Sequence, residues 1–187
     1  MGILSKNLTY QEFRELDFDD NDSFWYELIN GQLVRKQSPS IQHQRISRKI
    51  GGVLDNYAIQ TQSGEMFYAP LDVVLDDNNA YHPDIFFIKK ERSFLLDTKE
   101  QVVIGAPDLV IEILSKSTAV YDKGSKKGNY ERNGVREYWL IEPKNKSVEV
   151  YALTQQRYEL MAYQEETGVV SSIILEGFVL DLEQIFE

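Results

Sequence analysis

Cysteine is absent from all 187 residues of the sequence, which excludes disulfides and thiolate metal sites. No apolar run approaches the roughly 18–20 residues that a bilayer-spanning helix requires. The first ten residues also lack the hydrophobic segment of a signal peptide. We therefore expect a cytoplasmic protein with no membrane partner.

An excess of positive charge is also lacking, since the formal net charge at pH 7 is −10. Such an acidic chain is unsuited to coating nucleic acid non-specifically, although it is compatible with a local basic surface. The most basic stretch lies between Lys116 and Arg136, where six lysines and arginines accompany only two carboxylates. Either a solvated helix face or a binding surface explains this stretch.

The composition is that of a folded globular protein, with 42% hydrophobic and 12% aromatic residues. The length is sufficient for one domain with a substantial core. No internal repeat, low-complexity tract or linker interrupts the chain. We expect a single domain over residues 1–187.

Periodicity and turn residues predict an alternation of strands and helices. Asn30-Gly31, between two apolar runs, is the strongest hairpin signal in the chain. Ile46, Ile50 and Leu54 recur at helical spacing and predict a helix of about twenty residues that begins near Ser40. Residues 76–80 have the composition of a turn. Further helices are predicted at residues 9–16 and 118–133, and strands at residues 66–68, 71–75, 82–88, 109–114, 137–142, 148–152, 158–163 and 169–175.

One carboxylate, Glu112, lies inside the most hydrophobic run of the chain, residues 109–114. A strand that is apolar on both faces is typical of a sheet covered on both sides. A glutamate buried there must be paired, protonated or bound to a cation, because desolvating a lone charge is costly. Small polar residues and a lysine-bearing helix follow directly, an arrangement typical of a functional site.

Asp84 stands at the start of another apolar strand, so two carboxylates from neighbouring strands are predicted to meet. Mg²⁺ takes oxygen ligands and usually only one or two protein carboxylates, with water and phosphate oxygens completing its shell. A bound cation acidifies water and neutralises developing charge, and a nearby lysine stabilises the same charge. The two acids therefore predict a site for Mg²⁺, or for Mn²⁺ in its place, that acts on phosphate esters.

Six segments make the sequence similar to a known family: residues 26–34 (YELINGQLV), 38–44 (SPSIQHQ), 69–75 (APLDVVL), 82–88 (HPDIFFI), 105–124 (GAPDLVIEILSKSTAVYDKG) and 134–143 (GVREYWLIEP). Together they resemble the Uma-type restriction endonuclease family, a bacterial branch of the PD-(D/E)xK nuclease superfamily. The resemblance runs from Tyr10 to Tyr163. It implies an α/β (α+β) fold with a restriction-endonuclease-like core, a mixed β-sheet flanked by helices.

The resemblance also implies roles for particular residues. Asp84 would be the superfamily's aspartate and Glu112 its second acid, and together they would bind the metal. The lysine that usually lies two residues after that acid is missing here, and Lys126 on the following helix matches the place where this family carries it. Glu27 and His43 match further family positions at the edge of the site, although an exposed hairpin position and a structural histidine are their ordinary interpretations.

Two assignments stay open at this level. Asp108 follows a second proline and shares strand parity with Glu112, so it points to the same face. We prefer Asp84 because a turn at the entrance of the strand explains Asp108. The active lysine is Lys126 or one of its neighbours on the chain, Lys116, Lys123 and Lys127.

The sequence therefore predicts a Mg²⁺-dependent endonuclease that hydrolyses DNA phosphodiester bonds, with its basic stretch along the DNA backbone. A homodimer suits the cutting of two strands, and the late aromatic residues are either its interface or core: Tyr138, Trp139, Tyr151 and Tyr158. The alternative is a non-catalytic accessory protein that binds nucleic acid or metal with the same fold, since no residues for reading base edges are recognisable.

Overall fold

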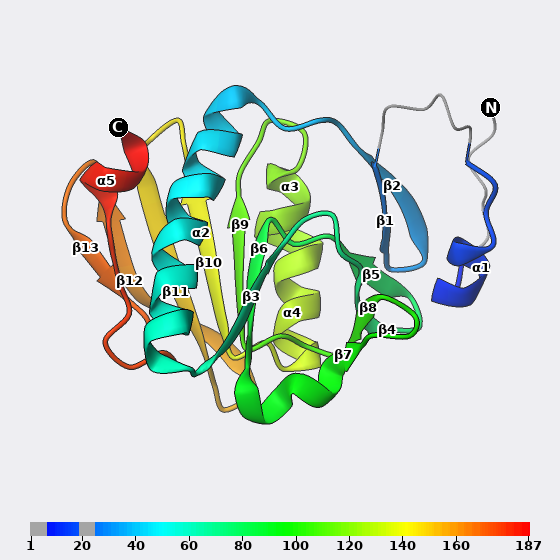
Figure 1. Ribbon diagram of the computed structural model, residues 1–187. Coiled ribbons are helices and arrows are strands. Elements are labelled where there is room, and N and C mark those ends of the chain that lie inside the picture. The colour runs from blue at the N-terminus through cyan, green and yellow to red at the C-terminus, as the bar shows by residue number, and fades with distance from the viewer. Residues whose placement is uncertain (1–6, 19–24) are drawn as a thin grey trace.

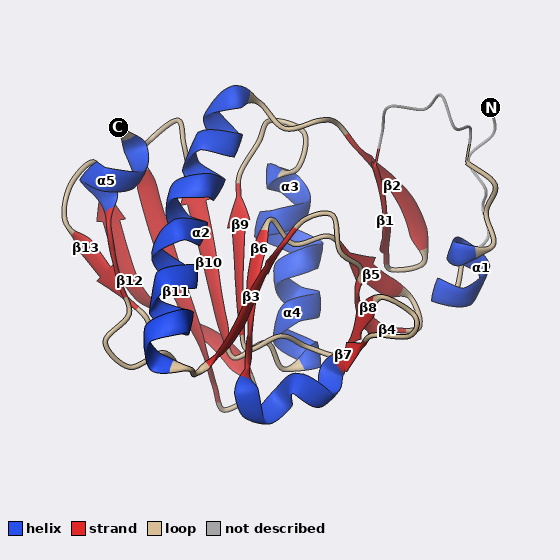
Figure 2. Cartoon of the chain, viewed as in Figure 1, coloured by secondary structure: helices blue, strands red, loops and turns tan. Residues whose placement is uncertain are grey.

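Two six-stranded sheets and a set of helices form the computed structural model, which describes residues 7–18 and 25–187 (Figures 1 and 2). Sheet A has the order β2-β1-β5-β4-β8-β7, with β1 (Trp25–Ile29), β2 (Gln32–Lys36), β4 (Val73–Asp76), β5 (Asn79–Tyr81), β7 (Leu96–Asp97) and β8 (Val102–Ile104). Sheet B has the order β12-β11-β10-β9-β6-β3, with β3 (Gly64–Tyr68), β6 (Ile85–Lys89), β9 (Leu109–Ile113), β10 (Glu137–Glu142), β11 (Ser147–Thr154) and β12 (Arg157–Glu165). A ribbon joins β13 (Val169–Ser171) to β14 (Val179–Asp181).

Helices cover both faces of sheet B, with α2 on one face and α4 on the other, beside sheet A (Figure 1). The helices are α1 (Tyr10–Arg14), α2 (Ile41–Thr61), α3 (Ala119–Tyr121), α4 (Lys127–Asn133) and α5 (Leu182–Phe186), with a 3₁₀ helix η1 (Lys90–Leu95) and a π-helical turn η2 (Asp122–Lys126). Within the described residues, no helix combines the length and the hydropathy needed to cross a membrane. The mixed sheet flanked by helices that the sequence predicts is confirmed.

Strand β9 lies inside sheet B between β6 and β10, and all five of its residues are buried. Leu109, Ile111 and Ile113 pack in the core that α2 covers. Val110 packs on the other side, in the core that contains Tyr130 of α4. The predicted strand with two covered faces is therefore confirmed, and Glu112 is 1% exposed within it.

The pairing of β6 with β9 determines where the two predicted acids lie. These strands are antiparallel, and Ile85 pairs with Ile111. Residues directly opposite each other in an antiparallel pair point to the same face of the sheet. One step further along the register therefore places Asp84 opposite Glu112.

The hairpin and the long helix also agree with the sequence. Asn30 and Gly31 have φ values of 51° and 73°, and a type I′ hairpin turn requires positive φ at both central residues. Ser40 caps α2 by accepting a hydrogen bond from the backbone N–H of His43 at 3.2 Å. Capping at Ser40 fixes the first turn of α2, and with it the place of His43.

Sheet A was only partly predictable. Residues 76–80, predicted as a turn, contain the start of β5, because Asn79 pairs with Asp76 across a tight connection. Strands β7 and β8 fall in a segment with no predicted strand. Elements of two or three residues are too short to show an alternation of side chains, so their neighbours in the sheet define them.

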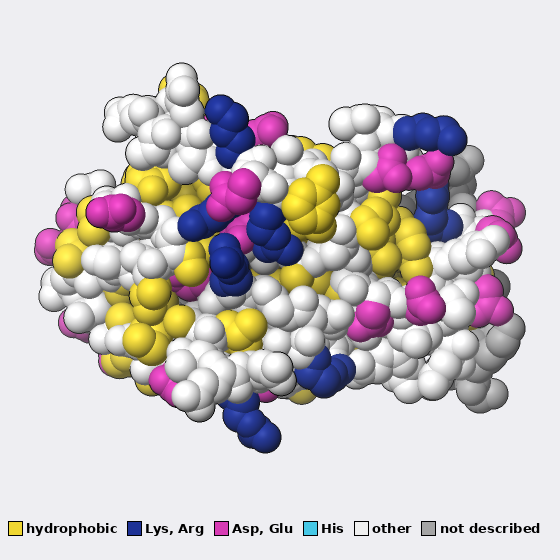
Figure 3. Space-filling model, turned by 90° about the horizontal axis from the view of Figure 1, so that it is seen from below, with side chains coloured by type: hydrophobic (Ala, Val, Ile, Leu, Met, Phe, Trp, Pro, Cys, Tyr) yellow, Lys and Arg dark blue, Asp and Glu magenta, His cyan; other side chains and the backbone are white. Residues whose placement is uncertain are grey.

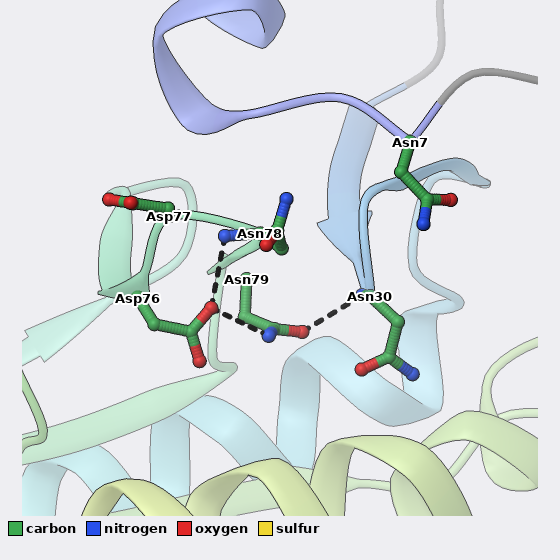
Figure 4. A pocket seen from close by; sticks show the side chains of 6 residues that line it. All are labelled: Asn7, Asn30, Asp76, Asp77, Asn78 and Asn79. Atoms are coloured by element: carbon green, nitrogen blue, oxygen red, sulfur yellow. Dashed lines mark hydrogen bonds between the residues drawn. The ribbon is translucent and has the colours of Figure 1, made fainter.

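A network of asparagine side chains joins sheet A to α4, beside a polar pocket of about 650 Å³ (Figure 4). The Asn79 amide oxygen accepts the backbone N–H of Asn30 at 2.9 Å, and its amide nitrogen donates to Asp76 at 2.7 Å. Asn129 of α4 donates to the same Asn79 oxygen at 2.6 Å. The network anchors α4, the helix that follows Lys126, to the hairpin that carries Glu27.

Candidate functional site

Asp84 and Glu112 meet at one end of two neighbouring inner strands of sheet B, where β6 begins and β9 ends. The backbone N–H of Asp84 lies 3.4 Å from Glu112 Oε2, and the backbone N–H of Ile113 donates to Asp84 Oδ2 at 2.8 Å. Each carboxylate thus contacts the main chain of the other strand, as the antiparallel register requires. The structure brings together the two acids that the sequence singles out as metal ligands.

Lys126 lies directly on Glu112, although it is 14 residues later in the chain. Its Nζ is 2.6 Å from Glu112 Oε1, 3.3 Å from Asp122 Oδ1 and 3.4 Å from Glu27 Oε1. The Lys126 side chain is only 1% exposed, and lysine is almost never fully buried without a partner. One ammonium group therefore joins carboxylates from β1, β9 and η2.

The π-helical turn η2 and the start of α4 present one face to Glu112. Asp122 and Lys126 form an ion pair four residues apart, and the Tyr130 hydroxyl donates to Glu112 Oε1 at 2.8 Å. The spacing of these residues in the sequence predicted the shared face. A π turn inside a helix is frequent at functional sites.

Glu27 is 2% exposed, so the interpretation of this residue as part of an exposed hairpin face is wrong. Strand β1 lies between β2 and β5, and Lys126 closes the side of the strand on which Glu27 projects. Its Oε1 also lies 3.1 Å from Lys36 Nζ and accepts the backbone N–H of His82 at 2.9 Å. The structure thus places Glu27 in the cluster with Lys126.

His43, in the first turn of α2, contacts Asp84. The two side chains meet through His43 Nε2 and Asp84 Oδ2 at 3.0 Å. Burial lowers the pKa of His43, but the hydrogen bond and the charge of Asp84 outweigh it, so the pKa is raised overall. The same contact, with the charge of Lys36, lowers the pKa of Asp84 against the effect of burial. His43 and Asp84 thus favour a charged pair.

Carboxylates outnumber ammonium groups in the cluster, which contains Glu27, Asp84, Glu112 and Asp122 but only Lys36 and Lys126. Burial raises the pKa of Glu112 to about 7 even though Lys126 lowers it, and Asp122 and Asp84 raise it further. Burial likewise raises the pKa of Asp122 against the effect of Lys126. Glu112 and Asp122 are therefore the carboxylates that take up protons most readily, which relieves the surplus negative charge of the cluster.

For Lys126 and Glu27, the attraction between opposite charges outweighs the effect of burial on the pKa. Burial lowers the pKa of Lys126, but the charges of Glu112, Glu27 and Asp122 hold it well above its usual range. Burial raises the pKa of Glu27, but Lys126 and Lys36 outweigh it and bring this pKa down to about 2. The ammonium of Lys126 and the carboxylate of Glu27 therefore stay charged near neutral pH.

A cavity of about 970 Å³ opens over this cluster. Asp84 and Ile113 line it, whereas Glu112 and Lys126 are buried behind them. Asp84 is the one carboxylate among the described lining residues, in a chain with a net charge of −10. Four lysines and arginines and two histidines also line the cavity, namely Lys36, Arg45, Arg48, Lys116, His43 and His82.

The basic stretch between Lys116 and Arg136 does not form one surface for a substrate backbone. Lys126 is buried, Lys123 pairs with Glu142 at 3.0 Å, and Arg136 pairs with Asp108 at 3.2 Å. Lys127 lies over the ring of Tyr151, 3.2 Å from its centroid. These residues point in different directions because they lie on different turns of the helix formed by η2 and α4 and, for Arg136, in the connection just before β10. Only Lys116 of this stretch reaches the cavity.

The same distances distinguish Lys126 from its three neighbours. Lys116 is exposed at the cavity, Lys123 pairs with Glu142 of β10, and Lys127 lies over Tyr151 of β11. Among the described lysines, Lys126 is the one whose ammonium contacts Glu112. The geometry therefore favours Lys126.

Asp108 directly precedes β9, at the end of the strand opposite to Glu112, and it is fully buried. Figure 3 shows the molecule from below, a face on which lysines and arginines lie beside carboxylates. Asp108 Oδ1 lies 3.0 Å from Arg92 and 3.2 Å from Arg136, and its Oδ2 accepts the backbone N–H of Lys89 at 2.9 Å. These partners give Asp108 a structural explanation. It takes no part in the cluster around Glu112.

The donor set around Asp84 fits a small hard cation. Asp84 lines the cavity, its Oδ1 makes no hydrogen bond with a described residue, and Glu112 Oε2 has only the long contact to the Asp84 backbone. The described residues contain no group of three or more histidine, cysteine, aspartate or glutamate side chains that could hold a metal ion. A cation here would need water or phosphate oxygens as well, which is usual for Mg²⁺.

Sequence reasoning missed Lys36 and the pair formed by His82 and Asp72. His82 Nε2 lies 2.6 Å from Asp72 Oδ1, and Tyr10 donates to Asp72 Oδ2 at 2.7 Å. No spacing along the chain links these residues, since β2, α1 and the connections before β4 and after β5 meet only in the folded protein. The only local indication that His82 lies near the site was its position in the sequence, directly before Pro83 and Asp84.

Residues 10–183 match the family Uma2, whose description is "Putative restriction endonuclease". The chain belongs to this family. The predicted family is thereby confirmed for nearly the whole chain.

The individual proteins that resemble this Uma2 chain include the following two. One is the uncharacterized protein sll1609 of Synechocystis sp., which is 28% identical over 137 residues, 72% of this chain and 76% of the relative. The other is a crystal structure from Anabaena variabilis ATCC 29413, titled as a "putative nuclease belonging to DUF820". It matches with a TM-score of 0.77 over 96% of this chain and 97% of the other, at 23% identity, which shows a shared fold.

Proposed function

We propose that this chain is a Mg²⁺-dependent endonuclease that hydrolyses DNA phosphodiester bonds. The observation that carries the proposal is the cluster of Asp84, Glu112 and Lys126 beneath a basic cavity. The description of the Uma2 family supports the same reaction class. Buried acids with perturbed pKa values next to a cleft are typical of catalytic sites.

Asp84 and Glu112 would hold the cation, for which Mn²⁺ could substitute. When bound there, the cation would lower the pKa of a coordinated water and neutralise charge on the phosphate. Glu112 must be ionised to bind it, and Lys126 favours that form by lowering the pKa of Glu112. His43 orients Asp84 through their 3.0 Å contact, and its raised pKa favours a proton on the imidazole at the cavity, where a general acid would act.

Glu27 acts through Lys126. Its carboxylate draws the ammonium toward β1 and stays ionised near neutral pH because Lys126 and Lys36 lower its pKa to about 2. Together with Asp122, Glu27 holds the ammonium in its place on Glu112. Glu27 is therefore a positioning residue in this proposal.

DNA would enter through the cavity. Arg45, Arg48 and Lys116 are exposed there, and none of them forms an ion pair with a described residue. Free guanidinium and ammonium groups bind phosphate oxygens. These three residues take the place that the sequence had assigned to the whole stretch from Lys116 to Arg136.

A non-catalytic accessory protein is the second candidate. One observation favours it: Lys126 and Tyr130 already occupy Glu112 Oε1, at 2.6 and 2.8 Å. An acid neutralised in this way could serve stability alone. Such a protein would bind nucleic acid or metal through the same cavity without hydrolysing a phosphodiester.

The test is cleavage of plasmid and single-stranded DNA with Mg²⁺ or Mn²⁺. The wild type should cut only with the metal, and Glu112→Ala should lose more than about 100-fold of the rate, since even a residue that only supports a ligand contributes about 10–100-fold. Glu91→Ala, an exposed acid on η1, is the matched control and should cut normally. Cleavage that survives in a folded Glu112→Ala protein would contradict the proposal, and binding without any cleavage would favour the accessory protein.

We also propose a homodimer, because two-fold symmetry suits the cutting of two strands. Tyr138 and Trp139 are fully buried, and Tyr151 and Tyr158 pack against the same core as Tyr138, so these aromatic residues are core. Sedimentation equilibrium with and without DNA would test the dimer, and a monomer under both conditions would contradict it.

A further inference from the structure

The cavity over Asp84 has an aromatic wall in addition to its basic residues. Trp25 of β1 and Tyr68 of β3 both line it, and they are 47% and 43% exposed. Ile41 and Pro70 line the cavity as well, and Ile41 is 73% exposed. Large apolar side chains left in contact with solvent at a cavity often mark a place where a ligand packs.

Both aromatic rings are held in place by the fold. Trp25 packs edge to face with His82, with ring centroids 6.4 Å apart. Tyr68 lies in a notch on α2, because a Cβ at Gly51 would come within 1.8 Å of its hydroxyl. A glycine inside a 21-residue helix lowers helix stability, so the notch has a cost that the packed tyrosine offsets. Rings fixed in this way lose little conformational entropy when a ligand stacks on them.

The charges around the cavity complement a polyanion. Arg45, Arg48 and Lys116 are exposed and make no ion pair with a described residue, and Asp84 is the one carboxylate in the described lining. A ligand that suits both the basic residues and the aromatic wall of the cavity carries phosphates together with flat aromatic groups. A nucleic-acid strand has this chemistry, since successive bases stack on aromatic side chains while a basic groove follows the backbone.

We propose that the cavity binds an unpaired nucleobase, stacked on Trp25 and Tyr68, so that the substrate is single-stranded or locally unpaired nucleic acid. Inside a duplex the neighbouring base pairs cover both faces of each base, and only the edges are accessible. Trp25 and Tyr68 offer flat apolar surfaces, which fit base faces. This inference rests on the proposed function and specifies the substrate that reaches Asp84.

Binding can be measured without cleavage, by fluorescence anisotropy of a labelled oligonucleotide in EDTA. The wild type should bind a single strand more tightly than the duplex of the same sequence. Trp25→Ala should weaken single-strand binding between about 5-fold and 150-fold, the range for losing one base stack. Trp25→Phe keeps a ring and should retain most of the affinity, and Tyr68→Leu provides an independent second variant.

Two controls separate stacking from general effects. Phe94→Ala removes an aromatic side chain that is 76% exposed on η1, away from the cavity, and should bind as the wild type does. An oligonucleotide with abasic positions keeps the phosphates, and its weaker binding should be insensitive to Trp25→Ala. The inference would be overturned if the wild type bound the duplex more tightly than the single strand. It would also be overturned if Trp25→Ala lowered the affinity for intact and abasic strands by the same factor.

The outcomes also distinguish this inference from the proposed function. Cleavage that depends on Glu112 but is unaffected by Trp25→Ala on single strands would overturn the unpaired-base site and leave the endonuclease intact. Trp25-dependent binding of single strands by a protein that never cuts would support the site and contradict the endonuclease.

Discussion

The two ends of β9 each carry a buried acid, and their surroundings differ. Asp108 is fully buried but has two guanidinium groups and a backbone N–H as partners. Glu112 shares one ammonium with two other carboxylates, and its pKa is raised to about 7 because burial outweighs Lys126. Burial of an acid alone therefore does not identify a site. A site is instead indicated by surplus negative charge next to a cavity, because such a buried acid lacks a full set of positive partners and can bind a cation.

Removal of the shared ammonium should have the largest effect on stability. Lys126→Met would leave Glu112 and Asp122 buried without their cation and Glu27 with Lys36 alone, and we expect a loss of about 3–5 kcal/mol in the free energy of unfolding. Urea denaturation at pH 8 measures it. The matched control is Lys123→Met, because Lys123 is 45% exposed in a surface pair and should matter little. Equal losses in the two variants would contradict the central role of Lys126.

At the other end of β9 the effect should be smaller and purely structural. Asp108→Asn removes the charge that Arg92 and Arg136 share, and we expect a loss of about 2–3 kcal/mol, since both guanidinium groups reach solvent and can be rehydrated. DNA cleavage by the folded variant should stay near the wild-type rate. A loss of cleavage as large as that of Glu112→Ala would remove the distinction between the two ends.

His43 should give the smallest effect, and one that depends on pH. The raised pKa of His43 means that its stabilising charge is fully present below the unfolded value of about 6.5 and is lost as pH rises through the folded value. In EDTA, His43→Gln should therefore lose on the order of 1 kcal/mol at pH 6 and much less at pH 9. A loss that is the same at both pH values would show that the Asp84 contact does not hold the proton.

The fold and part of the site could be predicted because long elements carry a readable pattern. The five buried residues of β9 and the stripe of α2 gave the main sheet and its cover. Glu112 lies inside such an element and Asp84 directly precedes another, so their meeting could be expected. Lys126 followed from a resemblance and from helical spacing, although its burial could not be read from a basic stretch.

What sequence reasoning missed depends on tertiary contacts. Glu27 is buried because Lys126 covers it from 99 residues away in the chain, and β5 exists because β1 and β4 pair with it. Lys36 and Trp25 lie beside Asp84 and the cavity only after β1 and β2 have docked. Short strands and distant pairs of this kind leave no local periodicity.

The most direct measurement is the stability of Glu112→Gln beside the wild type, with EDTA and with Mg²⁺. A raised pKa means that ionised Glu112 disfavours folding, so metal-free wild type loses stability as pH rises from the ordinary value of 4.5 toward about 7. At pH 8 in EDTA the variant should therefore be more stable, by about 1–3 kcal/mol. Mg²⁺ should stabilise the wild type by mass action and leave the variant unchanged. Equal stabilisation of both proteins, or none in the wild type, would contradict a metal site at Asp84 and Glu112.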